Sequence, residues 1–396
     1  MKTVYVIGTC DTKGEELHFA RECVHGAGAR AVLVDVSTQG SGEADVAAAD
    51  VAAFHPHGAS AVLGRKDRGE AVSAMAVALK HYLQSRRDIG AVLGLGGGGN
   101  TALVTEAMRA LPVGVPKLMV STMASGQVAP YVGPTDIAMM HAVADIAGLN
   151  AITRKVIGNA AHAAAGMAMN DVPDDSDSKP AIGLTQFGVT TPLITALRSR
   201  LEDQCECFVF HATGTGGQCF EKLADSGFFS AVFDMTTTEV ADHLFAGVLP
   251  CTDDRFGAFI RRPMPYVGSV GACDMVNFGP RDTVPAKYAH RKFHVHNAQV
   301  TLMRTTPEES RAIGQFIVER LNRMQGPMRF LLPLRGVSAI DAAGQVFDDP
   351  AADAALFDAI RKGWVAAANR KLVEVDANIN DPAFADAAIA AFQEIT

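Results

Sequence analysis

Short runs of apolar, often β-branched residues alternate with longer helical patterns along the first half of the chain. The runs are continuous rather than alternating in polarity, which is typical of strands that are covered on both faces of a parallel sheet. They lie at Thr3–Gly8, Arg30–Val36, Ile89–Leu95 and Pro116–Thr122. The segments between them place apolar residues three or four positions apart, which predicts helices. This rhythm predicts an α/β fold built on a parallel sheet.

The end of the first half is richer in alanine. From Thr135 to Met169 apolar residues dominate, and we expect two helices that are separated near Gly148 and Asn150. The next segment, Asn170–Pro180, is polar, acidic and contains two prolines. Such a segment is the expected domain boundary.

The strand, loop and helix rhythm then starts again. The segment "CECFVFHATGTGGQ" resembles the glycine-rich loop of the first half in layout, and "TTPEESRAIGQFIVERLN" carries a helix start. There Thr306 is the expected N-cap, Pro307 the first helical residue and Glu309 the partner in a capping box, which predicts a helix of about four turns. The sequence thus predicts two Rossmann-like domains, residues 1–175 and 180–396, whose parallel sheets face a central cleft.

Charge and composition narrow the class of protein. The formal charge is −8, from 35 basic and 43 acidic residues, so a broad basic face for nucleic acid is not expected. No apolar run reaches the roughly 18 residues of a membrane span, and the first residues become polar too early for a signal peptide. Seven cysteines without a CxxC pair fit reduced thiols. We therefore expect a cytoplasmic protein that binds neither nucleic acid nor membranes.

The loops after the expected strands are small, hydroxylated and rich in glycine. In open parallel sheets ligands bind beyond the carboxyl ends of the strands, where these loops meet the starts of helices. Backbone N–H groups and hydroxyls donate hydrogen bonds there, and helix dipoles favour negative charge. The pattern favours a ligand that carries phosphate.

The segment Gly94–Thr101, "GLGGGGNT", is the most distinctive of these loops. It formally contains GxGxxG, but no acidic residue follows about twenty positions later, in "KLMVSTM", which disfavours NAD. No GxxxxGK[ST] motif occurs in the sequence. What remains is a glycine-rich turn, capped by Asn100 and Thr101, that could wrap a phosphate. The alternative is that the glycines only allow a tight turn and close helix packing.

Several charged residues are candidates for chemistry. Asp11 could hold magnesium or a ribose hydroxyl and Lys13 could neutralise a phosphate, or they could be a helix cap and a solvated lysine. Arg304, next to the capped helix, could bind an anion, or it could be a surface arginine. His294 and His296 share one face of an extended segment, but no third metal ligand is near in sequence, and their role is left open.

The motifs together resemble a known family. "VYVIGTCDTKGEEL", "GLGGGGNTAL", "VPKLMVSTMASG", "YVGPTDIAMMHAVADIAGLN", "TGTGGQCFEKL", "DMTTTEV" and "VTLMRTTPEE" are similar, in order, to the bacterial and plant family typified by the tomato mosaic virus resistance protein. The resemblance implies two Rossmann-like domains, ATP or a related nucleotide bound with magnesium, and a homodimer. In plant members a TIM-barrel domain follows this unit, and the resemblance does not extend to it. Relatives often have serine at the position of Gly98, so a hydroxyl contact is lost here while the backbone cradle is kept.

The leading hypothesis is an ATP-binding protein with Mg²⁺, acting on an unidentified small molecule by phosphoryl transfer or an ATP-driven reaction. The expected nucleotide-binding residues are Cys10, Asp11, Thr12, Lys13, Gly14, Asp35, Gly96, Gly97, Gly98, Gly99, Asn100, Thr101, Ser121, Thr122, Met123, Ala124, Ser125, Gly126, Thr213, Gly214, Gly216 and Gly217.

If the protein is an enzyme, the catalytic candidates are Asp11, Lys13, Asp234 and Arg304, with Arg281 as a further charge stabiliser and Asp11 as the candidate magnesium ligand. Two alternatives stay open: a non-catalytic, nucleotide-gated regulatory module, and a sugar-nucleotide enzyme.

Overall fold

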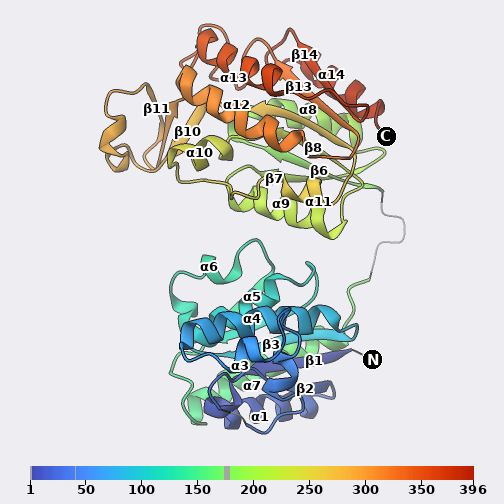
Figure 1. The fold of residues 1–396 in the computed structure, drawn as a ribbon, viewed down its shortest axis with the longest axis vertical. Coiled ribbons are helices and arrows are strands. Elements are labelled where there is room, and N and C mark those ends of the chain that lie inside the picture. The colour runs from blue at the N-terminus through green and yellow to red at the C-terminus, as the bar shows by residue number, and fades with distance from the viewer. Residues whose placement is uncertain (1, 41, 174–178) are drawn as a thin grey trace. The chain divides into compact units, whose positions relative to one another are not determined.

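The chain forms two compact units, Met1–Asp174 and Asp175–Thr396. The structure is a computed structural model that describes residues 2–40, 42–173 and 179–396. Figure 1 shows that each unit is a sheet with helices on both faces. Both units are Rossmann-like α/β folds, as the sequence predicts, and each is described by itself.

Unit 1 is built on a five-stranded parallel sheet of order β2-β1-β3-β4-β5. Its strands are β1 Thr3–Gly8, β2 Arg30–Asp35, β3 Ile89–Gly96, β4 Lys117–Ser121 and β5 Ile137–His141. Val6, in the middle of β1, is paired with Leu33 on one side and Leu93 on the other. The four strands expected from the apolar runs are therefore confirmed.

Helices cover both faces of this sheet because successive side chains of a strand point to opposite faces. Val4 and Val6 of β1 pack in one core with α1 (Cys10–Gly26) and α7 (Ala151–Met169). Tyr5 and Ile7 pack in another with α4 (Arg68–Ser85) and α5 (Gly98–Arg109). The helices of unit 1 are α1 Cys10–Gly26, α2 Ala48–Ala52, α3 Ser60–Leu63, α4 Arg68–Ser85, α5 Gly98–Arg109, α6 Ala129–Val132 and α7 Ala151–Met169, with a 3-10 turn, η1, at Thr122–Ser125.

The expected pair of helices between Thr135 and Met169 is half wrong. The first of them is the edge strand β5, which is paired with β4, and only the second, α7, is helical. A short apolar run cannot be assigned to strand or helix by its pattern alone. The unpaired edge of β4 makes this run a strand, because it forms backbone hydrogen bonds with the residues of β5. Gly148 does mark the break, with φ +89°, and Asn150 caps α7.

Unit 2 is built on a six-stranded parallel sheet of order β14-β13-β9-β8-β6-β7. Its strands are β6 Ala181–Gln186, β7 Glu206–His211, β8 Ala231–Thr236, β9 Tyr266–Gly271, β13 Met328–Pro333 and β14 Arg370–Val375. One face packs against α8 and α14 and the other against α9, α11, α12 and α13 (Figure 1).

The helices of unit 2 are α8 Thr191–Leu201, α9 Thr215–Ser226, α10 Glu239–Phe245, α11 Gly257–Arg261, α12 Pro307–Leu321, α13 Pro350–Gly363 and α14 Pro382–Gln393, with 3-10 turns η2 Gly188–Thr190, η3 Arg281–Thr283 and η4 Ala286–Tyr288. The predicted capping box of α12 is confirmed. The Glu309 N–H donates to Thr306 Oγ1 at 3.3 Å, and the Thr306 N–H donates to Glu309 Oε2 at 2.9 Å.

A small antiparallel sheet of order β10-β12-β11 extends unit 2. Its strands are β10 Met275–Phe278, β11 Phe293–Asn297 and β12 Val300–Arg304. The sequence predicts a loop over residues 294–306, before the capped helix, and this is wrong because β11 and β12 form a hairpin there.

The two sheets share one strand order. Numbered within its own unit, each runs 2-1-3-4-5, and unit 2 adds a sixth strand. The order reverses between the first and third strands, which are β1 and β3 in unit 1 and β6 and β8 in unit 2. The loop at Thr213–Gly217 follows β7, the second strand, so it is not the counterpart of the loop after β3. The expectation that the two glycine-rich loops correspond to each other is therefore wrong, because they follow strands at different positions in the two sheets.

Within the described ranges, no helix has both the length and the apolarity to cross a membrane.

Candidate functional site

A pocket of about 480 Å³ lies at the carboxyl edge of the sheet of unit 1. Its walls come from the loop after β1, the loop after β2, the start of α4 and the turn after β3. This is the point where the strand order reverses, the usual ligand site of open parallel sheets. Of the residues expected from the sequence, Asp11, Thr12, Lys13, Gly97, Gly98, Gly99 and Asn100 line it together.

Three helices begin at this pocket. Thr9 precedes α1, Arg68 is the first residue of α4, and Gly97 is the N-cap of α5, and all three residues line the pocket. The N-terminus of a helix carries unpaired N–H groups and the positive end of the helix dipole. Three such ends around one cavity favour an anion.

The glycines of the turn after β3 fall into two groups. A Cβ on Gly94 would lie 2.5 Å from the Met119 sulfur, and one on Gly96 would lie 2.6 Å from the Asn100 Cβ, so packing requires both glycines. A Cβ on Gly97 or Gly98 would meet no atom closer than 3.6 Å, and one on Gly99 would meet none within 4 Å. None of the three has a positive φ. The fold does not itself require glycine at these positions.

The wall of the pocket carries both positively and negatively charged side chains. Lys13 Nζ donates to the carbonyl oxygen of Ile146. Arg68 is exposed and makes no hydrogen bond or ion pair with the described part of the chain. Asp11 is the one carboxylate among the described lining residues. Its N–H donates to Ser37 Oγ at 3.1 Å, and its carboxylate has no hydrogen-bond partner among the residues described.

Asn100 is the most buried polar side chain of the wall. It is 8% exposed, and its Nδ2 donates to the carbonyl oxygen of Leu95. Its Oδ1 is buried and has no partner in the described structure. Gly96 leaves the space in which this side chain lies.

Other residues of unit 1 that the sequence predicts to bind the nucleotide lie behind the pocket wall and hold its loops in place. Asp35 Oδ1 accepts hydrogen bonds from the Cys10 N–H at 3.0 Å and the Ser37 N–H at 2.9 Å, which fixes the start of α1. Burial and the Asp35 carboxylate raise the pKa of Cys10 to about 12, so it is a neutral thiol. Thr101 Oγ1 and Ser121 Oγ are 2.6 Å apart below the turn.

The remaining expected residues of unit 1 do not line the pocket. They are Gly14, Thr122, Met123, Ala124, Ser125 and Gly126. Thr122 and Met123 lie next to the turn, 3.7 Å and 3.6 Å from the Cβ positions of Gly97 and Gly98.

In unit 2 the loop at Thr213–Gly217 has internal reasons for its glycines. Gly214 has φ +70°, a Cβ on Gly216 would lie 1.9 Å from the His211 carbonyl oxygen, and one on Gly217 would lie 2.3 Å from Glu239 Oε1. Packing accounts for all three glycines without a ligand.

Asp234 is buried in a cluster around Arg255. It accepts hydrogen bonds from Arg255 Nη2 at 2.8 Å, Thr185 Oγ1 at 2.9 Å and the Tyr266 hydroxyl at 2.9 Å. Arg255 also donates to Glu221 at 2.8 Å and to Glu239 at 2.6 Å. We call Arg255, Asp234, Tyr266, Glu221 and Glu239 the Arg255 cluster. Asp234 is fully buried and engaged, so it is not exposed to a substrate.

Arg304 is buried as well, contrary to the surface position that the sequence allowed. Its Nε donates to the Phe347 carbonyl oxygen at 2.8 Å, and its Nη2 donates to Asp341 at 2.8 Å and to Asp353 at 2.7 Å. Burial, together with the nearby Asp274 carboxylate, raises the pKa of Asp341 to about 9. Because its guanidinium is already engaged, Arg304 stabilises the core of unit 2 and has no exposed face for an anion.

The other candidates of unit 2 lie on or next to its small sheet. The guanidinium of Arg281 stacks over the ring of Phe293, 3.9 Å from the centroid. The rings of His294 and His296 are 6.4 Å apart. Within the described ranges no three His, Cys, Asp or Glu side chains are placed to hold a metal ion.

Family models match both parts of the chain. The N-terminal domain of "Uncharacterised protein family (UPF0261)" matches residues 2–173, and its C-terminal domain matches residues 179–396. The chain belongs to the UPF0261 family.

Its relatives come from bacteria and a plant. A UPF0261 protein of Rhizobium meliloti is 55% identical over 100% of this chain and 99% of its own length, and one of Clostridium tetani is 42% identical over 97% and 96%. The ToMV resistance protein Tm-1 of Solanum lycopersicum is 40% identical over 99% of this chain, which spans 56% of the tomato protein. The resemblance stated from the motifs is confirmed. A solved C2-type ketoreductase matches at 17% identity, 95% of this chain and 81% of its own, but its TM-score of 0.23 is too low to inform fold or function.

In unit 2 of this UPF0261 chain, unlike unit 1, buried side chains fill the point where the strand order reverses. Thr190 Oγ1 and Thr236 Oγ1 are 2.9 Å apart there and both are buried. Later loops cover them, since the Ala339 N–H and Asn380 Nδ2 both donate to the Val189 carbonyl oxygen, at 3.0 Å and 2.9 Å.

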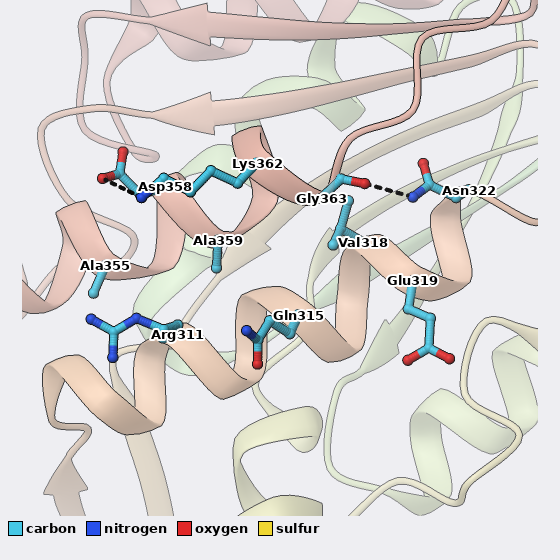
Figure 2. A pocket seen from close by; sticks show the side chains of 10 residues that line it. All are labelled: Arg311, Gln315, Val318, Glu319, Asn322, Ala355, Asp358, Ala359, Lys362 and Gly363. Carbon is cyan, nitrogen blue, oxygen red and sulfur yellow. Dashed lines mark hydrogen bonds and ion pairs between the residues drawn. The ribbon is translucent and has the colours of Figure 1, made fainter.

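A surface groove of about 580 Å³ runs along α12 and α13, which pack against each other (Figure 2). Arg311, Gln315 and Glu319 of α12 line it together with Asp358 and Lys362 of α13.

The set of residues expected from the sequence did not include half of the pocket of unit 1. Of the lining residues outside the expected set, Thr9, Val36, Thr38 and Gln39 belong to the loops after the first two strands, where a ligand is expected from the sequence. The residues that sequence reasoning missed are Arg68, Val72 and Leu103. A signal for Arg68 was present, because Asp67 three residues before Glu70 is an N-cap pattern that starts α4 at Arg68, and the Glu70 N–H donates to Asp67 Oδ1 at 2.8 Å.

Proposed function

We propose that unit 1 binds a nucleotide through its phosphates, with ATP as the first candidate, in the pocket between the loops after β1 and β3. The observation that carries the proposal is the space around Gly97, Gly98 and Gly99. These residues have ordinary backbone angles and no packing need for glycine, yet they line the pocket at the start of α5. Glycine there lets a ligand approach the bare N–H groups of the turn.

The rest of the wall supports a ligand with a charged end and an apolar end. Lys13 and Arg68 add two positive charges to the helix N-termini. Val36, Val72 and Leu103 supply an apolar surface, and Thr38 and Gln39 supply polar groups beside it. A nucleotide has this division, since its phosphates are anionic and its base is flat and largely apolar.

The proposal concerns binding in the first place. Asp234 and Arg304 are buried, so any reaction on the nucleotide would draw on Asp11 and Lys13. Release of phosphate from ATP by the full chain separates an enzyme from the regulatory alternative. Preference for a UDP-sugar over ATP would favour the sugar-nucleotide alternative.

The test compares the full chain with its Gly97→Val variant. We expect ATP to raise the melting temperature of the wild type, because a ligand at 100 times its Kd adds about 2.7 kcal/mol to the free energy of unfolding. Gly97→Val should keep the melting temperature without ligand, because its Cβ meets no atom closer than 3.7 Å. It should lose the shift, because a branched side chain on the turn hinders the close approach of a phosphate to the N–H groups.

The control is Gly166→Ala on α7, where a Cβ meets no atom within 4 Å and which does not line the pocket. This variant should bind ATP like the wild type. Unchanged ATP affinity in Gly97→Val would contradict the proposal.

A further inference from the structure

The loop between β5 and the cap of α7, residues 142–149, is held by two side chains of α1. Lys13 Nζ donates to the Ile146 carbonyl oxygen, and Glu16 Oε1 accepts a hydrogen bond from the Gly148 N–H at 2.6 Å. We call these two contacts the loop ties. Lys13 also lines the pocket, whereas Glu16 does not. One of the two ties is therefore made by a side chain that bound phosphates would also engage.

The helix α1 is broken at Lys13, whose φ of −135° and ψ of 26° are not helical. The turn before the break, with Asp11 and Thr12, lines the pocket. The part after the break carries Glu16, which holds the loop. Lys13 thus lies at the junction between a pocket wall and a loop support. A few residues at such junctions absorb the changes in φ and ψ when a protein rearranges.

The loop itself contains a strained residue. Val143 has φ +67°, a left-handed conformation that is a rare exception for a β-branched residue. The Ala144 N–H donates to the Ala142 carbonyl oxygen at 2.7 Å and closes a three-residue turn around it. The Val143 side chain is 64% exposed, so its own packing does not hold the turn. Such strain persists only where the surroundings fix it, and the loop ties fix this segment.

We propose that the loop after β5 responds to the occupancy of the unit 1 pocket through Lys13. A hydrogen bond from an ammonium group to a phosphate joins two charged groups and is stronger than one to a neutral carbonyl. Phosphates in the pocket therefore draw Lys13 Nζ away from the Ile146 carbonyl oxygen, and the loop keeps only its tie to Glu16. This inference rests on the proposed function and assigns a regulatory output to the same site.

The coupling must be reciprocal, because each of two linked equilibria shifts the other by the same factor. If phosphates loosen the loop, a loosened loop favours phosphates, since Lys13 is then no longer held by Ile146. Loss of the tie to Glu16, which lies outside the pocket wall, should therefore tighten ATP binding. A loop that only supports the pocket would show the opposite, because loosening it would weaken binding.

The first experiment measures hydrogen exchange of residues 142–149 in the full chain, with and without saturating ATP. In the wild type ATP should speed this exchange about threefold or more, because local opening sets the rate. Adenosine, which has no phosphate, should leave the exchange unchanged. Lys13→Met should exchange fast without any ligand. The control Lys155→Met removes an exposed lysine of α7 that does not line the pocket, and it should behave like the wild type.

The second experiment measures ATP affinity by calorimetry in two variants of Glu16. Glu16→Gln removes the charge but keeps an oxygen for the Gly148 N–H, whereas Glu16→Ala removes both. ATP should bind about threefold more tightly to Glu16→Ala than to Glu16→Gln, because only the alanine loosens the loop. The glutamine variant accounts for the effect of the lost charge on an anion. Glu16 is 2% exposed, so if Glu16→Ala does not fold, the exchange of Lys13→Met decides the question.

The outcomes separate the two proposals. The coupling is overturned, and nucleotide binding stands, if ATP binds without changing the exchange of the loop or if adenosine has the same effect as ATP. Slow exchange in ligand-free Lys13→Met, or no tighter ATP binding in Glu16→Ala than in Glu16→Gln, overturns the coupling as well. Absence of any nucleotide binding by the wild type overturns both proposals.

Discussion

The Glu239 carboxylate accepts a hydrogen bond from the Gly214 N–H at 3.1 Å and fixes the start of α9. The same carboxylate fills the space beside Gly217, where a Cβ would lie 2.3 Å from Oε1. The glycines of this turn make room for a side chain of the protein. Those at Gly97–Gly99 make room for nothing within the described chain, and the two turns should therefore respond oppositely to substitution.

We expect Gly217→Ala to lower the free energy of unfolding by about 1–3 kcal/mol, because the added methyl overpacks against Glu239. Gly99→Ala should instead raise it by up to about 1 kcal/mol, since alanine favours the helix and meets no atom. Urea denaturation of the full chain measures both changes, and hydrogen exchange assigns each to its unit. A neutral Gly217→Ala variant would contradict the packing account.

The Arg255 cluster predicts that unit 2 loses stability as pH rises. Burial raises the pKa of Glu221 from 4.5 to about 7, an effect that Arg255 opposes and Asp234 adds to. A raised pKa means that the folded state holds a proton which the unfolded state releases. The free energy of unfolding should therefore fall between about pH 4.5 and pH 7 and level off above.

Glu221→Gln tests this dependence. Glu221 accepts both of its hydrogen bonds, from Arg255 Nη1 and the Phe256 N–H, through Oε1, which glutamine keeps. The variant should lose up to about 1.4 kcal/mol per pH unit of the slope, the limit for one group. The control Glu202→Gln changes an exposed carboxyl and should keep the slope. Equal slopes in the wild type and Glu221→Gln would show that folding does not raise the pKa of Glu221.

Arg304→Lys should destabilise the chain strongly. Lysine cannot reproduce the fork that joins Asp341, Asp353 and the Phe347 carbonyl oxygen. Each of these buried acceptors that is left without a donor is destabilising by about 1–3 kcal/mol. Chemical denaturation measures the loss, and calorimetry should find ATP affinity unchanged in the folded variant. A stable Arg304→Lys variant with weakened ligand binding would restore the anion-site interpretation.

The capping box of α12 offers a local test. Thr306→Ala removes the acceptor of the Glu309 N–H and should lower the free energy of unfolding by about 1 kcal/mol. Thr306→Ser keeps the hydroxyl and should be nearly neutral. Thermal denaturation of the pair is sufficient. A similar loss in both variants would place the effect in the threonine methyl rather than in the cap.

The local parts of the site could be predicted from the sequence, and the long-range parts could not. The end of β1 and the turn at Gly97–Gly99 follow from continuous apolar runs and the glycines after them, which are signals within a few residues. Arg68 and Val72 come to the pocket on α4, and their place depends on the strand order of the whole unit.

The burial of a charged side chain was the other feature that could not be predicted from the sequence. Arg304 next to a helix start has the same local pattern on a surface and in a core. Its partners Asp341 and Asp353 follow 37 and 49 residues later, so the sequence around Arg304 does not reveal them. The same holds for the run that forms β5, because only the free edge of β4 selects a strand.

The fold does not require glycine at positions 97, 98 and 99, so the residues found there should depend on the property that is selected. A library of variants screened for heat resistance alone should gather alanine at positions 98 and 99, where a methyl group meets no atom closer than 3.6 Å. A library screened for retention of a bound ligand should keep glycine there. The residues that accumulate under each regime would report, from sequence data alone, what this turn is kept for.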